Sequence, residues 1–182
     1  SQASSQPLIT FKQINPETDD YYPVGNWRDS AAAFPGQKSP LAPYDVNCVF
    51  YPQALKIIRT YLDYFDNLDE AHLDELITKW DHHKIKFRLY HDEGLLGYSL
   101  ALHGRKNIPM PIAHLDESYD LFYGEPTLEE TVSFAKKILD PDFFYTPVGP
   151  LLVAADEPDF NTKQYHGKVI WPKQAGFAVA GL

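Results

Sequence analysis

The hydrophobic positions between residues 44 and 80 repeat with the period of an α-helix. The first predicted helix starts near Tyr44-Asp45 and carries Pro52 early in its length. A second helix follows Asp69, a residue type that caps helix N-termini. Because the connection between them is short, the two helices are expected to be antiparallel neighbours. Their apolar stripes comprise Val46, Val49, Phe50, Ile57, Ile58, Tyr61, Leu62 and Phe65 in the first helix, and Leu73, Leu76, Ile77 and Trp80 in the second.

Two more helices are predicted further along the chain. Thr127 and Glu130 have the spacing of a capping box, and the apolar period after them continues until Asp140-Pro141. Pro172 suits the first turn of another helix, where its missing N–H costs nothing. The apolar, small-residue segment 173–182 needs burial, so we expect it to pack against helices outside this chain or across a dimer. The 182 residues are therefore expected to be part of a larger folding unit.

The remaining segments have the texture of loops. Residues 1–43 are polar and rich in Pro and Gly, while 107–126 and 143–166 are long and lack sustained periodicity. Residues 85–103 fit either type of element, although Lys86–Tyr90 alternates like a strand. The overall pattern predicts an all-α protein of helical hairpins, in which long loops gather at one end and build a cleft.

Charge and motifs exclude several classes of function. A net charge of −9 and a pI near 5.1 disfavour a nucleic-acid partner, and no apolar run is long enough to span a membrane. The single Cys48 excludes an internal disulfide and fits a small buried hydrophobe. Phosphate-loop and dinucleotide-binding motifs are absent, so no cofactor is predicted. Motifs of a Ser or Cys nucleophile are absent as well, so hydrolysis through such a nucleophile has no support. The compartment, cytoplasmic or secreted, stays open.

Aromatic residues are unusually common, with 12 Tyr, 11 Phe and 3 Trp making up 14% of the chain. Such rings fill large helical cores, and they also stack on the C–H faces of sugars in carbohydrate-binding clefts. On composition alone the first explanation is favoured.

One candidate site is the loop containing Trp27, Arg28 and Asp29. An aromatic platform, a guanidinium and a carboxylate in succession could stack a sugar, bind its hydroxyls and supply a proton. The structural alternative is a local ion pair between Arg28 and Asp29 with Trp27 packed beneath it.

Other candidate residues come from three further segments. Asp45 and Asn47 lie at a helix start, where Asp45 is also expected to cap the helix. Tyr165-His166 and Trp171 form a polar-aromatic loop, whose structural explanation is a buried His under a Trp.

Asp116-Glu117 follows His114 closely, but the spacing fits no standard ligand pattern and no metal is predicted.

The order of these motifs resembles the six-hairpin glycosidases, the glucoamylase, trehalase and glycogen-debranching type of enzyme built on an (α/α)6 toroid. The resemblance spans nearly the whole chain but matches only the later portion of such a domain. Residues 1–182 would then be a single, incomplete domain of this type, a partial toroid. The matching segments are Asn26-Trp27-Arg28-Asp29-Ser30, Pro43-Tyr44-Asp45-Val46-Asn47, Thr146-Pro147-Val148-Gly149 and Tyr165-His166-Gly167-Lys168-Val169-Ile170-Trp171-Pro172.

The resemblance implies inverting hydrolysis of a glycosidic bond in an oligo- or polysaccharide by a carboxylic acid and a carboxylate base. Asp29 resembles the proton donor, with Trp27 and Arg28 lining the sugar subsite. Asp45, Asn47, Asp116, Glu117, Tyr165, His166 and Trp171 complete the expected substrate-binding set. The base of this family usually lies beyond the Trp-Pro helix, where this chain offers no matching residue.

Two other functions stay open. A non-catalytic helical module that binds carbohydrate or a protein partner would explain the missing base. A polysaccharide lyase on the same toroid would use Tyr and His for β-elimination, with Tyr165-His166 as the pair.

Overall fold

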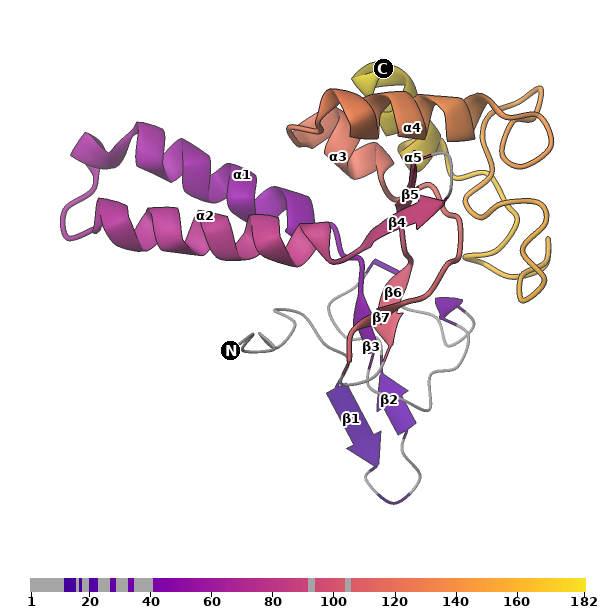
Figure 1. The fold of residues 1–182 in the computed structure, drawn as a ribbon, viewed down its shortest axis with the longest axis horizontal. Helices are drawn as coiled ribbons and strands as arrows, with labels where there is room; N and C mark the ends of the chain where they lie inside the picture. The colour runs from indigo at the N-terminus through magenta and orange to yellow at the C-terminus, as the bar shows by residue number, and fades with distance from the viewer. Residues whose placement is uncertain are drawn as a thin grey trace.

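The structure is a computed structural model, in which we describe residues 12–15, 17, 20–22, 27–28, 33–34, 41–91, 94–103 and 106–182. Five α-helices and one short 3-10 turn lie within these ranges (Figure 1). They are α1 (Asn47–Thr60), η2 (Leu62–Tyr64), α2 (Glu70–Ile85), α3 (Ser118–Tyr123), α4 (Leu128–Leu139) and α5 (Pro172–Gly181).

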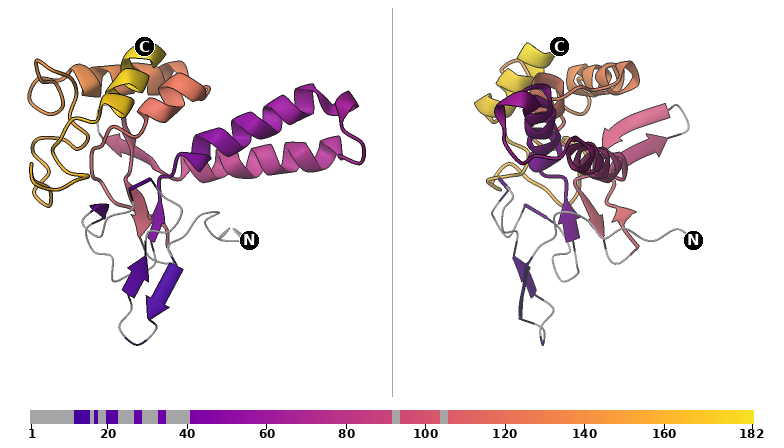
Figure 2. Two further views of the ribbon diagram at one scale, coloured as in Figure 1. Left: turned by 180° about the vertical axis from the view of Figure 1, so that it is seen from behind. Right: turned by 90° about the vertical axis from the view of Figure 1, so that its left-hand side faces the viewer.

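Helices α1 and α2 form the predicted antiparallel hairpin, which projects away from the rest of the molecule (Figures 1 and 2). Asp69 caps α2 by accepting the N–H of Ala71, as the sequence predicts. Asn67 makes the turn between the helices with a φ of 70°, a conformation that Asn tolerates better than most residues. Stacking of Tyr51 on Trp80, with centroids 5.0 Å apart, holds the two helices together nearer the body.

Short antiparallel sheets accompany the helices, so the prediction of an all-α fold, and with it the partial (α/α)6 toroid, is wrong. β1 pairs with β2, β6 lies between β3 and β7, and β4 pairs with β5. The strands are β1 (Lys12–Asn15), β2 (Asp20–Tyr22), β3 (Leu41–Pro43), β4 (Arg88–His91), β5 (Gly94–Tyr98), β6 (Ala101–His103) and β7 (Ile108–Pro109).

Most of the strands are too short for sequence periodicity to identify them, although the strand-like alternation of Lys86–Tyr90 overlaps β4. β3 and β6 have three residues each, so neither can show sustained alternation of polar and apolar positions. Helix α3 was not predicted, for another reason. Its first turn, from Ser118 to Leu121, is buried although it carries a charged residue, so the polarity of the sequence does not reveal which face of the helix lies inside. The predictions for α4, with its capping box, and for α5, with Pro172 in its first turn, are confirmed.

The hydrophobic core lies where β5, β6 and α4 meet the loop of residues 144–160. Tyr98, Leu100, Leu102, Phe134, Phe144 and Leu152 are among the largest fully buried side chains. Gly97 in β5 has a φ of 148°, and a Cβ there would lie 2.7 Å from the Glu117 Oε1 atom. Glycine therefore lets this strand run against a buried charged pair.

A buried polar network joins β5 to α2, α3 and α4. The phenol of Tyr98 lies within hydrogen-bond distance of the carboxylates of Asp120 and Glu130. Lys84 pairs with Asp120 at 3.0 Å, and Arg88 pairs with Glu130 at 2.9 Å. Burial and the two carboxylates raise the pKa of Tyr98, so its phenol stays protonated and acts as the donor.

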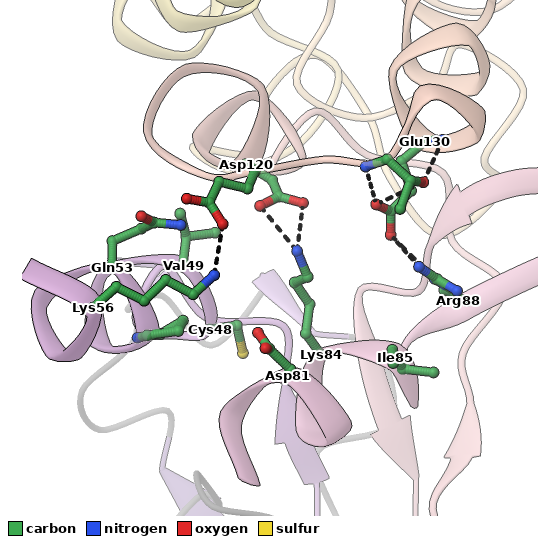
Figure 3. Close-up of a pocket in the computed structure, with 13 residues that line it drawn as sticks. Cys48, Val49, Gln53, Lys56, Asp81, Lys84, Ile85, Arg88, Asp120 and Glu130 are labelled. Atoms are coloured by element: carbon green, nitrogen blue, oxygen red, sulfur yellow. Dashed lines mark hydrogen bonds and ion pairs between the residues drawn. The ribbon is translucent and has the colours of Figure 1, made fainter. Parts of the chain in front are cut away.

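The same ion pairs line a cavity of about 230 Å³ between the hairpin and the α3–α4 connection (Figure 3). Cys48 lies at its wall, fully buried, and burial raises the pKa of its thiol to about 12. The three cations that line the cavity, Lys56, Lys84 and Arg88, are each paired with a carboxylate. These pairs join elements distant in the sequence, so we interpret the residues around the cavity as structural.

The last helix is only partly covered. α5 packs against α3 and buries Ala178, while Gly181 lies so close that a Cβ would meet the Leu121 backbone at 2.5 Å. Its opposite face exposes Val179 and Leu182. Whether another polypeptide covers that face stays a prediction. None of the helices in the described ranges has the length and apolarity needed to cross a membrane.

We predict that Tyr98→Phe destabilises the fold by about 1–3 kcal/mol, because it leaves two buried carboxylates without their shared donor. Urea denaturation at neutral pH measures the change. Tyr145→Phe is the matched control, because Tyr145 is 53% exposed and loses only a solvated hydroxyl. Equal stability of the Tyr98 and Tyr145 variants would show that the Tyr98 hydroxyl contributes nothing.

Candidate functional site

A buried ion pair connects two of the predicted site segments. The guanidinium of Arg28 donates to both oxygens of Asp116, from Nε at 2.7 Å and from Nη2 at 3.2 Å. Its Nη1 donates to the carbonyl of His166 at 3.1 Å. Both side chains are essentially inaccessible to solvent. The pair therefore ties the N-terminal part of the chain to the segment before α3 and to the C-terminal loop.

Aromatic rings gather around this ion pair. Trp27 meets His166 and Trp171 edge-to-face, with centroids 4.9 and 5.8 Å apart. His166 and Trp171 are stacked, with an angle of 9° between their planes. Tyr165 meets Trp171 edge-to-face at 4.7 Å, and its carbonyl accepts the indole N–H of Trp171. Trp27 and Trp171 thus form two nearly perpendicular walls, at 74° to each other, and both are partly accessible.

A cation and a phenol lie against the same rings. The Lys173 ammonium is 4.7 Å from the centroid of Trp27 and 5.4 Å from that of Tyr119. Partial burial lowers the pKa of Lys173, and the nearby Asp116 opposes this. Gln174 donates to the Tyr119 hydroxyl at 3.3 Å, and burial raises the pKa of that phenol. Both Lys173 and Gln174 come from the first turn of α5.

Asp45 supplies a carboxyl whose charge is poorly stabilised. It is fully buried, and burial raises its pKa from 3.8 to about 6, although hydrogen bonds from Asn47 oppose the shift and Asp116 adds to it. One oxygen accepts the N–H of Asn47 at 2.9 Å, and the other has no hydrogen-bond partner among the described residues. The prediction that Asp45 is the N-cap of α1 is wrong by one residue, because Val46 occupies that position and makes no side-chain cap. Asp45 lies just before it and accepts the N–H of Asn47, the first residue of the helix.

His114 lies in the same buried region and is neutral. Its Nδ1 accepts the N–H of Asp116 at 3.1 Å, which leaves the proton on Nε2. Burial lowers the pKa of His114 despite the neighbouring carboxylates. The 3.6 Å contact between His114 and Asp116 is therefore not an ion pair.

The structure brings together six of the predicted site residues: Trp27, Arg28, Asp116, Tyr165, His166 and Trp171. Asp45 interacts electrostatically with Asp116, and Asn47 follows Asp45 at the start of α1. Glu117 does not share the Trp27 environment, because its Oε1 is taken by Lys137 and by the N–H of Tyr98. Asp29, the predicted acid, lies outside the described residues.

The geometry bears on the structural explanations of two loops. Arg28 pairs with Asp116, 88 residues away, while the local pairing with Asp29 falls on a residue outside the described ranges. His166 is buried beside Trp171, as the structural explanation of that loop anticipated.

Sequence reasoning missed Lys173 and Tyr119. Lys173 follows Pro172 directly, so a helix beginning at Pro172 places it in the first turn on the side of the Trp171 loop. The position of Lys173 relative to Pro172 could therefore have identified it as a site residue from the sequence. Tyr119 had no comparable signal, because it lies in α3, within a segment predicted to be a loop.

Within the described ranges, no group of three or more His, Cys, Asp or Glu side chains could hold a metal ion. Comparison of the chain with models of known protein families finds no match. Comparison with curated proteins finds no relative either.

We predict that Asp45→Asn changes the pH dependence of stability. Because the pKa of Asp45 is raised to about 6 in the folded state, folded protein binds more protons than unfolded protein between about pH 4 and 6. Its contribution to stability is therefore present at low pH and is lost as pH rises through 6, a cost of about 3 kcal/mol at pH 7.

Asn keeps an oxygen that can accept the Asn47 N–H but cannot ionise. The variant should be more stable than wild type at pH 7, and the difference should vanish towards pH 4. Chemical denaturation of both proteins across this range measures it. A difference that does not change with pH would contradict the raised pKa.

Proposed function

We propose that this protein binds an oligo- or polysaccharide at the Trp27–Trp171 corner and takes part in hydrolysis of a glycosidic bond. The observation that carries the proposal is the convergence of Trp27, Tyr165 and Trp171 on the Arg28–Asp116 pair. Trp27 and Arg28 come from one end of the sequence and Tyr165 and Trp171 from the other, and these four occur in segments that resemble the six-hairpin glycosidases.

The geometry of the rings suits a sugar. Arg28 and Lys173 lie over the Trp27 ring, and His166 is stacked on Trp171. Both indoles are nevertheless partly accessible, and a pyranose would stack its C–H face on the indole surface that these groups leave uncovered. Tyr165 is 63% exposed, so it extends the aromatic surface towards solvent.

One polar group for sugar hydroxyls lies beside the rings, namely the exposed ammonium of Lys173. Tyr119 is buried and its hydroxyl accepts from Gln174, so it supports the site from below.

The buried acids divide into positioning and chemical roles. Asp116 has both oxygens occupied by Arg28, so it orients the guanidinium rather than reacting. Asp45 has a pKa suited to an acid, but its carboxyl is covered, and a proton donor must reach the glycosidic oxygen. We therefore keep Asp29, next to Arg28 in sequence, as the proposed general acid. It would give its proton to the leaving oxygen as the glycosidic bond breaks. The water that attacks the anomeric carbon must lose a proton to a carboxylate base, and we assign that base to no residue of this chain.

We predict that Asp29→Asn abolishes hydrolysis of unactivated glycosides while sugar binding and thermal stability stay close to wild type. Loss of a general acid typically lowers the rate by ~10²–10⁴-fold. Substrates with very good leaving groups should be affected less, because they need little protonation. Hydrolysis rates on both substrate types, measured alongside calorimetric binding and thermal melting, give the result.

Trp27→Ala is the comparison variant, since it should weaken binding by about 1 kcal/mol through lost stacking. If Asp29→Asn hydrolyses substrate at the wild-type rate, Asp29 is not the general acid. If the wild-type protein binds sugar but hydrolyses none, the protein is a carbohydrate-binding module. If the folded Trp27 variant binds sugar as tightly as wild type, the sugar does not bind at this site.

A further inference from the structure

The far end of the α1–α2 hairpin carries an exposed apolar groove. Five side chains from the end of α1 and from η2 line a cavity of about 290 Å³. Tyr64 is 84% exposed, Ile57 is 59% exposed and Tyr61 is 55% exposed. We define this surface, the hairpin tip, as Ile57, Ile58, Tyr61, Tyr64 and Phe65.

Isolated apolar side chains are common on protein surfaces, but a contiguous group at the end of a projecting element marks an interaction site. The hairpin extends away from the sheets and from α3–α5 in opposite views of the molecule (Figures 1 and 2). The tip is therefore reachable by a large partner. The turn at Asn67 and the capped start of α2 fix its shape before any partner binds.

Carboxylates outnumber cations around the tip. No Lys or Arg occurs between Thr60 and Thr78. The nearby cation Arg59 is already paired with Glu70 and Asp74. The carboxylates of Asp63, Asp66 and Asp69 form no ion pair with any residue in the described part of the chain, and all three are exposed.

This combination selects among possible occupants. A second copy of the chain would bring two sets of carboxylates against each other, which costs several kcal/mol when like charges are juxtaposed. An anionic lipid surface would be repelled in the same way. A protein segment with an apolar face flanked by Lys or Arg is complementary to both features, because its apolar side fills the groove while its cations meet the rim.

We propose that the hairpin tip is a docking site for a cationic amphipathic helix of a protein partner. The helix would lay its apolar face over Ile57, Tyr61 and Tyr64, with its basic flanks beside Asp63 and Asp66. The proposal is independent of the carbohydrate site, because it involves none of the residues around Trp27.

The test uses the full 182-residue chain and three synthetic 18-residue peptides. The first has a Leu face with Lys flanks, the second has the same Leu face with Glu flanks, and the third keeps the Lys but replaces each Leu with Ser. Fluorescence anisotropy of labelled peptides measures binding at low and at physiological salt. We expect the first peptide to bind at least ~10-fold more tightly than either other peptide, and its affinity to fall as salt rises.

Tyr64→Ser and Ile57→Ser should each weaken binding of the first peptide by ~10-fold or more. Both side chains are mostly solvated, so the fold tolerates their removal. Leu128→Ser is the matched control, because Leu128 is 80% exposed on α4, and binding should be unchanged. Equal binding of the Lys- and Glu-flanked peptides would overturn the proposal, as would binding that survives both tip substitutions. Self-association of the chain that Ile57→Ser abolishes would also overturn it, by showing that a second copy occupies the tip.

Discussion

The chain from His114 to Asp120 is the constraint on which the rest of the structure depends. Asp116, Glu117 and Asp120 are all at most 1% exposed. Buried carboxylates are tolerated only when cations and hydrogen-bond donors compensate them, because removing one partner leaves an uncompensated charge. Each carboxylate must therefore have its own cation close by, and the fold is arranged to supply one.

The three cations come from widely separated places. Arg28 reaches Asp116 from the N-terminal part, Lys137 reaches Glu117 from α4, and Lys84 reaches Asp120 from the end of α2. The backbone adds further ties, since the Leu115 N–H donates to the carbonyl of Leu152 and the Lys137 ammonium donates to the carbonyl of His114. One short segment thereby fixes the positions of the hairpin, α4 and the C-terminal loops.

The geometry of the candidate site follows from these ion pairs. Once Asp116 holds Arg28, the guanidinium is positioned to donate to the His166 carbonyl, and Trp27 is carried against His166 and Trp171. Asp116 also adds to the raised pKa of Asp45, which lies just before the start of α1. The rings therefore depend on a pair of charges that are themselves inaccessible.

Sequence patterns predicted the elements whose signals are local. Asp69 and Thr127 cap helices through hydrogen bonds to residues two or three positions away, so each start could be predicted without knowing the fold. Asp116 and Asp120 could not be interpreted in the same way. Polar residues in a Pro-rich segment indicate an exposed loop. Their burial is possible only because cations 88 and 36 residues away, Arg28 and Lys84, pair with them.

The candidate site, too, was predictable from the sequence only in part. The presence of Trp27, Tyr165 and Trp171 in loops suggested an aromatic surface, and the structure brings these residues together. The all-α fold expected around them was wrong because strands of two to five residues give at most a short alternation, such as that of Lys86–Tyr90. Aromatic side chains at loop positions were thus more informative about the site than the predicted architecture was.

Sugar binding against Trp27 and Trp171 can be tested on the three tryptophans of the chain. Trp80 packs on Tyr51 in the hairpin and serves as an internal reference. Titration of ¹⁵N-labelled protein with neutral oligosaccharides, followed through the indole N–H signals, measures all three at once. We expect the Trp27 and Trp171 signals to shift together with one dissociation constant while Trp80 stays in place. Shifts confined to Trp80, or no shift of the other two at saturating sugar, would contradict this expectation.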